Sequence, residues 1–133
     1  MARSLMAGGR RRLPRTVVAA IDASSVLGVR AGARSDHRFT GIWPVVIGGR
    51  VYGRSWSLKE GGWYRTFLDD PRGTIRIGSR AIRVRALPVK PTQIRDAVER
   101  AYAAKYRTPG SRKYVRGFRA KRRREATMEF VPR

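Results

Sequence analysis

Two hairpin patterns, each built around a tight turn, constrain the fold of this chain more than any other feature of the sequence. The first joins residues 42–47 to 50–55 through Gly48-Gly49, and the second joins 74–77 to 80–87 through Gly78-Ser79. Tight two-residue turns need positive φ angles, which glycine adopts without steric cost. The flanking segments are rich in Val and Ile, which favour strands. The sequence therefore predicts a mainly β fold made of antiparallel hairpins.

The first hairpin predicts strands that are covered on both faces. Pairing about the Gly-Gly turn places Val45 opposite Tyr52. Trp43 then lies opposite Arg54 on the same face. The other face carries a second, mostly apolar set: Ile42, Val46, Val51 and Ser55. Pro44 has no amide proton to donate, so it predicts an edge position or a bulge. Strands covered on both sides are typical of a closed barrel.

The second hairpin separates apolar from basic residues. One face carries Ile75, Ile77, Ile82, Val84 and Ala86. The other face carries Arg76, Arg83 and Arg85. This alternation predicts an antiparallel ribbon that is buried on one side and basic on the other.

The rest of the chain carries helix signals and two further strands. We expect helices over residues 14–21, 61–70, 92–106 and 114–118, and strands over residues 26–29 and 127–131. Thr92 is expected to cap the third helix. A length of 133 residues fits a single domain. We place it at residues 14–133, after a flexible basic arm over residues 1–13.

The chain is strongly basic, with 31 Lys and Arg against 9 Asp and Glu and a formal net charge of +22. Such a surface attracts polyanions and phosphorylated ligands, although an arginine-rich composition can also reflect the genome of the source. A local cluster is more informative than the total. Arginine holds phosphate through bidentate hydrogen bonds. We therefore take as candidate phosphate contacts the residues around the first hairpin: Arg30, Arg34, His37, Arg38, Arg54 and Ser55.

The side chains offer little catalytic chemistry of their own. Cysteine is absent and His37 is the one histidine, so no metal site can be assembled at usable spacing. No nucleophile elbow or P-loop is present either. An enzyme of this sequence would depend on a cofactor for its chemistry, and a flavin or deazaflavin needs a stacking surface and phosphate contacts. The candidate ring contacts are Trp56, Trp63 and Tyr64, although Trp63 also suits the core.

Residues 107–124 contain nine basic residues and no acidic one, with aromatic residues interleaved. Basic residues among aromatics are typical of proteins that bind single-stranded nucleic acid. The same features suit a phosphate-binding lid over a pocket or a solvated surface.

No apolar run is long enough for a membrane span, and no signal-peptide pattern is found. We therefore expect a cytoplasmic protein that does not contact a membrane.

The stretch from His37 to the end resembles an uncharacterised bacterial family, domain of unknown function 2255, which is grouped with the FMN-binding split barrels. It is also distantly similar to deazaflavin-dependent nitroreductases. The matching segments are residues 41–46, 50–55, 62–65, 72–75, 101–106 and 126–132. The resemblance implies a split antiparallel β-barrel in which the loop before the first hairpin, Ser55 and the Trp63-Tyr64 pair approach a cofactor. The usual phosphate loop is not intact here, and Arg65 follows the Trp-Tyr pair where relatives carry Asn.

Three functional hypotheses remain open. The first is a homodimeric flavin- or deazaflavin-binding oxidoreductase with a basic pocket for a phosphorylated small molecule or cofactor. The second is a nucleic-acid-binding module that uses residues 107–124 and the N-terminal arm. The third is a non-catalytic structural protein with a vestigial pocket.

Overall fold

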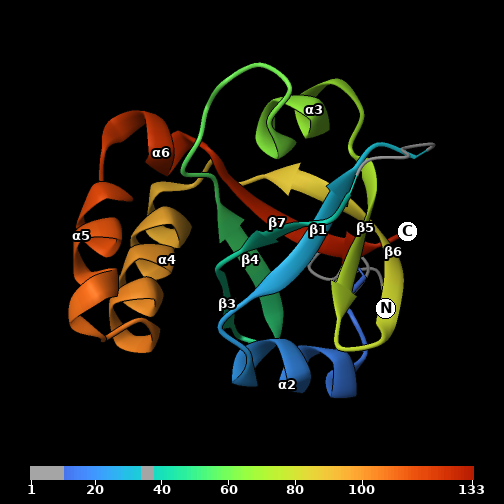
Figure 1. Ribbon diagram of the computed structural model, residues 1–133, viewed down its shortest axis with the longest axis horizontal. Helices are drawn as coiled ribbons and strands as arrows, with labels where there is room; N and C mark the ends of the chain where they lie inside the picture. Colours follow the sequence, from blue (N-terminus) through green and yellow to red (C-terminus); the bar gives the residue numbers. More distant parts are fainter. Residues whose placement is uncertain (1–10, 34–37) are drawn as a thin grey trace, which may run out of the picture.

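The computed structural model describes residues 11–33 and 38–133, which form a seven-stranded antiparallel sheet that curves into a nearly closed barrel (Figure 1). The strands follow the order β2-β1-β5-β6-β7-β4-β3. Their bounds are β1 Leu27–Ala31, β2 Thr40–Ile42, β3 Pro44–Ile47, β4 Arg50–Arg54, β5 Arg72–Ile77, β6 Arg80–Pro88 and β7 Thr127–Pro132. The expected split antiparallel β-barrel is confirmed.

A bend in one stretch of chain brings the two edges of the sheet together. Strands β2 and β3 lie at opposite edges, yet only Trp43 separates them in the sequence. The bend coincides with Pro44, which cannot donate a ladder hydrogen bond and so is confined to edges and bulges. The edge position expected for Pro44 is confirmed, since β3 pairs with β4 alone.

Both hairpins have the register that their turns predict. Val45 pairs with Tyr52, and Ile75 pairs with Ile82. Gly48, Gly49 and Gly78 have φ angles of 59°, 77° and 60°. In the second hairpin the expected sorting holds. The arginines of β5 and β6 are exposed, and the apolar positions predicted to face the core are at least partly buried: Ile75, Ile77, Ile82, Val84 and Ala86.

Two apolar clusters cover the two faces of the first hairpin. The barrel interior contains Val51 together with Leu27, Ile75 and Phe130. The second cluster lies outside the barrel, where Val45 and Tyr52 pack against the long helix α4 (Thr92–Lys105). The expectation that this hairpin is buried on both sides is therefore confirmed.

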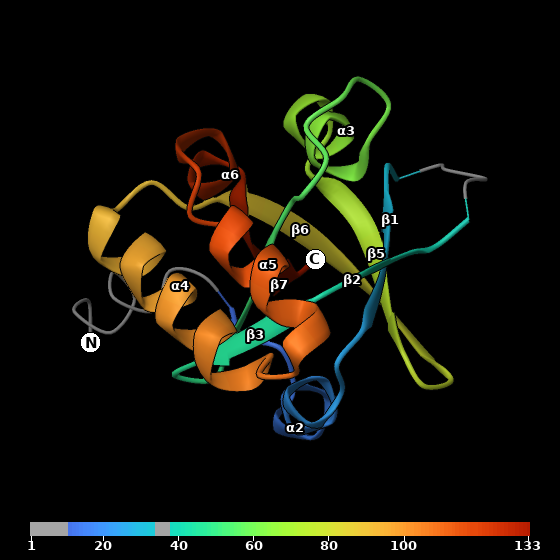
Figure 2. The same cartoon turned by 60° about the vertical axis from the view of Figure 1, so that its left-hand side comes forward.

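Four helices lie where the sequence predicts them but differ at several ends, whereas α6 lies in a stretch that was predicted only to be basic. Besides α4, the helices are α2 Arg15–Ala23, α3 Trp63–Asp69, α5 Pro109–Gly117 and α6 Lys121–Glu125. The prediction that Thr92 caps α4 is wrong, because Pro91 occupies the cap position and no side chain bonds there. Helix α5 begins well before Tyr114, because Thr108 caps it by accepting a hydrogen bond from the Ser111 amide. Figure 2 shows α4 and α5 side by side against the barrel.

The first ten residues lie outside the described part of the chain, so the flexible arm stays a prediction. Leu13, the last residue assigned to that arm, is buried in the barrel core. Among the described helices none is long and apolar enough to cross a membrane.

Candidate functional site

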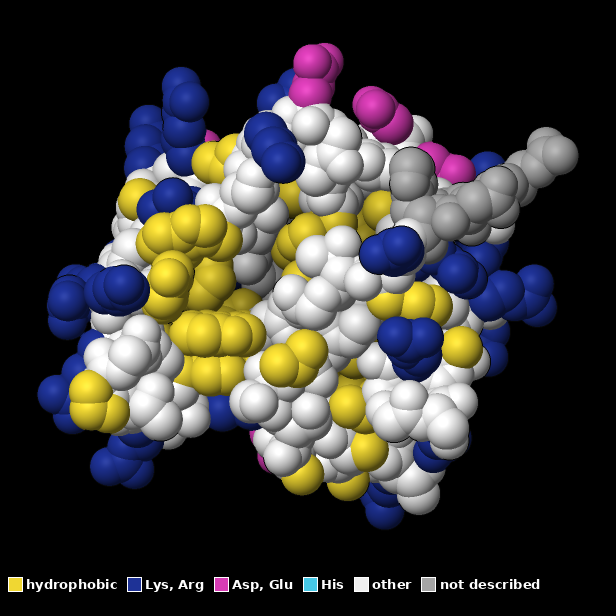
Figure 3. All heavy atoms as spheres, viewed as in Figure 1, with side chains coloured by type: hydrophobic (Ala, Val, Ile, Leu, Met, Phe, Trp, Pro, Cys, Tyr) yellow, Lys and Arg dark blue, Asp and Glu magenta, His cyan; other side chains and the backbone are white. Residues whose placement is uncertain are grey.

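A cleft of about 510 Å³ opens between the bend that joins β2 to β3, the end of β4 and helix α5. Figure 3 shows an apolar hollow on this face with Lys and Arg side chains around it. Ligand sites in proteins usually have volumes of ~300–1,000 Å³ and mostly apolar linings. We call it the aromatic cleft, and its lining is Thr40, Gly41, Ile42, Trp43, Arg54, Trp56, Ser57, Trp63, Tyr114 and Phe118.

Trp56 forms one wall of the aromatic cleft, and its indole is held between a glycine and an arginine. A Cβ atom added to Gly117 would lie 2.4 Å from the Trp56 ring, so only glycine allows the indole to approach α5 this closely. The Arg123 guanidinium lies 3.6 Å from the centre of a Trp56 ring. Arg123 also donates through Nε to the Trp56 carbonyl oxygen at 3.0 Å. Trp56 is therefore fixed although it is 39% exposed.

The opposite wall is Trp43, which sits at the bend between β2 and β3. Its ring stacks on Tyr106 with a centroid separation of 4.5 Å and an interplanar angle of 5°. Tyr114 of α5 meets Trp43 edge-on at 5.9 Å and Trp56 edge-on at 5.0 Å. Offset stacks and edge contacts of this kind are the favourable arrangements of aromatic rings. The cleft thus presents a preformed aromatic surface, and Tyr114 remains 38% exposed on it.

A second hollow, of about 620 Å³, adjoins the aromatic cleft and shares Trp56 and Ser57 with it. Four of its eight lining residues are cationic. We call it the basic hollow, and its charged members are Lys59, Lys121, Arg122 and Arg123. An aromatic space beside a cationic one can accept a ligand with a planar ring at one end and a phosphate at the other.

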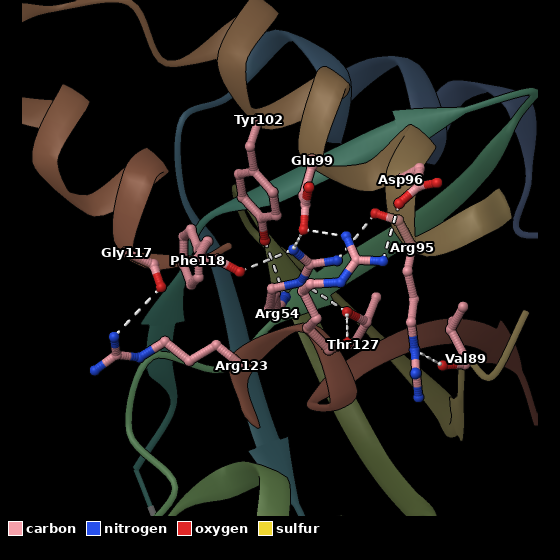
Figure 4. Close-up of polar contacts among 11 residues, drawn as sticks. Arg54, Val89, Arg95, Asp96, Glu99, Tyr102, Gly117, Phe118, Arg123 and Thr127 are labelled. Atoms are coloured by element: carbon pink, nitrogen blue, oxygen red, sulfur yellow. Dashed lines mark hydrogen bonds and ion pairs between the residues drawn. The ribbon is translucent and has the colours of Figure 1, made fainter. Parts of the chain in front are cut away.

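Arg54 lies at the base of the cleft, where its side chain is 0% exposed and holds four elements together (Figure 4). It donates to the Phe118 carbonyl at 3.0 Å and to the Arg95 carbonyl at 3.1 Å. It also donates to the Thr127 hydroxyl at 2.7 Å and forms an ion pair with Glu99. Burial lowers the pKa of the Arg54 guanidinium, and the Glu99 carboxylate opposes that shift. These bonds make Arg54 a structural cation.

The hydroxyl of Tyr102 completes the sheet where the strand bends. The register would place Trp43 opposite Arg54. Instead, the Arg54 amide donates to the Tyr102 hydroxyl at 2.9 Å, and this hydroxyl donates to the Trp43 carbonyl at 2.6 Å. Burial raises the pKa of Tyr102 above its ordinary value, so the hydroxyl keeps its proton. Tyr102 therefore fixes the bend that shapes the cleft.

The structure brings together only some of the sequence-predicted site residues. Trp56, Trp63 and Arg54 line the aromatic cleft. Ser55 follows β4 but is 1% exposed, and its hydroxyl donates to the Ser57 carbonyl. Tyr64 is half-buried and its hydroxyl donates to the Glu125 carbonyl at 3.4 Å.

The candidate phosphate contacts that precede the first hairpin are Arg30, Arg34, His37 and Arg38, and the two that the structure describes do not reach this site. Arg30 and Arg38 do not line either hollow. The Arg30 guanidinium lies over the Phe39 ring at 4.5 Å, and Arg38 is exposed. Arg34 and His37 lie outside the described residues. The role assigned to these four residues stays a prediction.

Sequence reasoning missed the residues that shape the cleft from α5 and α6. Gly117 gave no signal, because its role comes from contact with a tryptophan far away in the sequence. Three of the four cationic residues of the basic hollow belong to the basic segment 107–124, and Lys59 is the exception. No pattern in the sequence indicated that they lie next to Trp56. Within residues 11–33 and 38–133, no group of three or more His, Asp and Glu side chains is placed to hold a metal ion.

The sequence was compared with family models and with curated proteins. A family model described as an uncharacterized protein conserved in bacteria, DUF2255, matches residues 17–130. No curated protein matches the sequence.

Solved structures share the architecture at low sequence identity. A conserved hypothetical protein from Mycobacterium tuberculosis superposes with a TM-score of 0.61 at 15% identity, covering 95% of this chain and 84% of that one. A protein of unknown function from Agrobacterium tumefaciens gives 0.57 at 17% identity, covering 90% and 54%. A FAD-binding protein from Mesorhizobium loti gives 0.54 at 12% identity, covering 92% of each chain. At these identities the likeness shows a common fold.

Proposed function

The chain belongs to the DUF2255 family, and from this premise we propose that its aromatic cleft and basic hollow together bind a flavin or deazaflavin. The observation that carries the proposal is the junction of the two spaces at Trp56 and Ser57. A flavin mononucleotide or a deazaflavin has a planar ring system and a phosphate tail, so its two ends match the two linings. A solved structure with this fold is named as a FAD-binding protein, which supports the same class of ligand.

The ring system would lie against the preformed aromatic walls. Trp56 is immobilised by Gly117 and Arg123, and Tyr114 packs edge-on against it. Because these side chains are ordered before a ligand arrives, little conformational entropy is lost on binding. Trp63 lines the same cleft from α3 and would limit how far a ring can enter.

The phosphate would lie in the basic hollow. Lys59, Lys121 and Arg122 are exposed there, so they can turn toward an anion. The guanidinium of Arg122 offers a planar pair of donors that matches a phosphate. The arginines of the loop before the first hairpin are an alternative binding site for the same phosphate. Replacing Arg38 with alanine tests this alternative.

A bound flavin or deazaflavin would supply hydride transfer, which makes an oxidoreductase the enzyme class of this proposal. The chain's own residues would orient the ring, neutralise the phosphate and exclude water from the cleft. A homodimer and a cytoplasmic location remain part of this proposal as predictions.

The test is a titration of purified protein with FMN and with a 5-deazaflavin, followed by ligand fluorescence. We expect saturable binding that Gly117→Ala weakens by about tenfold or more, because the added methyl group must displace Trp56. Arg122→Ala should weaken binding as well, while Arg38→Ala should not. Phe39→Ala removes an aromatic residue that lies under arginines but does not line the cleft, and it should bind normally.

Each other outcome rejects a part of the proposal. Absence of binding to either ligand would reject it entirely and favour a vestigial pocket. Loss of binding in Arg38→Ala but not in Arg122→Ala would move the phosphate site to the loop. Circular dichroism of each variant shows whether the fold has been kept.

The hypothesis that residues 107–124 bind nucleic acid receives less support from the geometry. Phe118 is buried, and Tyr114, although 38% exposed, packs edge-on against the two tryptophans of the cleft. A row of exposed rings on which bases could stack is not what this segment presents.

A further inference from the structure

The second hairpin and its neighbours carry arginines on one surface of the barrel. Because side chains alternate along a strand, residues at every second position share a face. The outer face of β5 and β6 continues onto β1, which pairs with β5. It also continues onto Arg133, which follows β7 and whose amide donates to the Arg83 carbonyl of β6. We call this surface the arginine face, and its members are Arg30, Arg72, Arg76, Arg83, Arg85 and Arg133.

These side chains repel one another within the folded protein. Arg72 lies directly opposite Arg85 in the sheet, and like charges at such positions are destabilising. The pKa of Arg133 is lowered by partial desolvation and then by the charges of Arg83, Arg72 and Arg85. Asp70 accepts hydrogen bonds from Arg72 at 2.9 and 3.2 Å and so neutralises one member. The other members keep a repulsion that a bound anion would relieve.

Part of the arginine face is also ordered in advance. The guanidinium groups of Arg30 and Arg76 lie 4.5 and 4.3 Å from the centre of the Phe39 ring. Cation–π contacts of this kind orient both groups without consuming their hydrogen-bond donors. Arg76, Arg83 and Arg85 are exposed to solvent. Their donors are therefore available to a ligand that lies across the sheet.

We propose that the arginine face binds the phosphodiester backbone of a nucleic acid. Alternate residues on a strand are about 7 Å apart, and neighbouring strands are about 5 Å apart. The charges are thus spread over an open surface, which suits a polymer with regularly repeated phosphates better than one small anion. Double-stranded DNA carries one charge per ~1.7 Å of its axis. Arginine is the side chain best matched to phosphate, through its bidentate donors.

A membrane surface fits this face less well. Proteins that bind at a lipid interface combine basic residues with apolar side chains that enter the bilayer. Among the described residues, the large hydrophobic side chains that are exposed are Val26, Trp56, Leu68 and Tyr114. None of them belongs to β5 or β6, the two strands that carry most of the arginine face. The arginine face therefore offers charge without an apolar anchor, as a surface for a solvated polyanion does.

The experiment compares two double variants that remove the same charge from different places. Arg76→Gln with Arg83→Gln alters the arginine face, whereas Arg112→Gln with Arg116→Gln alters exposed positions of α5. Binding to a short labelled DNA duplex of arbitrary sequence is measured by fluorescence anisotropy over a series of NaCl concentrations. For the first variant we expect the slope of log K against log salt to be shallower by about 1.8, since each phosphate contact contributes about 0.9.

The α5 variant should keep the wild-type slope and affinity. An equal loss in both variants would overturn the proposal, because net charge alone would then explain binding. A loss confined to the α5 variant would assign nucleic acid to residues 107–124 instead. Absence of DNA binding in the wild-type protein, with or without binding to anionic phosphatidylglycerol vesicles, would also overturn it. All four substitutions are at exposed positions, so circular dichroism should show an unchanged fold.

Discussion

Replacing Tyr102 with phenylalanine removes one oxygen atom from the bend of the barrel. The ring would still fill its place, stacked at 4.7 Å on Phe118. The Arg54 amide would lose its acceptor and the Trp43 carbonyl would lose its donor. A buried polar group left without a partner costs about 1–3 kcal/mol. Arg54 is buried whereas Trp43 is only half-buried, so the amide should carry the full cost and the carbonyl a smaller one, and we expect a total loss of about 2–4 kcal/mol.

Urea denaturation followed by tryptophan fluorescence measures this loss at neutral pH. Tyr114→Phe is the matched control, because it removes the same atom from a residue that is 38% exposed, and such surface changes usually stay within about 0.5 kcal/mol. If Tyr102→Phe were no more destabilising than Tyr114→Phe, the hydroxyl would not be completing the sheet.

Two further predictions concern pH and packing. Burial raises the pKa of both Tyr102 and Tyr106, so between about pH 10 and the raised values the unfolded chain releases protons that the folded chain keeps. Urea midpoints should therefore show stability falling above about pH 10 by ~1.4 kcal/mol per pH unit for each of these tyrosines. In Tyr102→Phe the slope of stability against pH should be smaller by the contribution of one tyrosine. Gly73→Ala would place a Cβ atom 2.6 Å from a carbonyl oxygen of β1 and 2.6 Å from the ring of Phe67, so we expect a loss of about 1–3 kcal/mol in thermal denaturation. A loss under about 0.5 kcal/mol would mean that the barrel relaxes more easily there than its backbone contacts indicate.

Much of the fold could be predicted because its signals are local. A pair of glycines at a turn sets the register of the strands on either side, and the alternation of Arg76, Arg83 and Arg85 with apolar residues fixes which face is buried. The edge position of Pro44 follows from its missing amide proton. The cap of α4 was misassigned because Pro91 and Thr92 both suit a helix start, and local preference alone does not decide between them.

The candidate site could be predicted only in part, because its geometry depends on contacts between distant segments. Trp56 was identified from its position after a strand. Its support by Gly117 and Arg123 has no local signature, since these residues are more than fifty positions away and meet it only in the folded chain. Arg54 was predicted to contact phosphate because it belongs to a local group of arginines, and arginine binds phosphate through bidentate hydrogen bonds. Its hydrogen bonds to the carbonyl oxygens of Phe118 and Arg95 depend on segments far away in the sequence, and the phosphate contact stays a prediction.

The position of β7 has a consequence for how the protein folds. This strand is the last in the sequence, yet it pairs with β6 on one side and β4 on the other. Until residues 127–132 have left the ribosome, both of those strands present unpaired backbone groups to any neighbouring chain, and exposed edges of this kind are sites of aggregation. Pairing between segments so far apart also slows folding. Folding of the barrel should therefore wait until β7 has been synthesised.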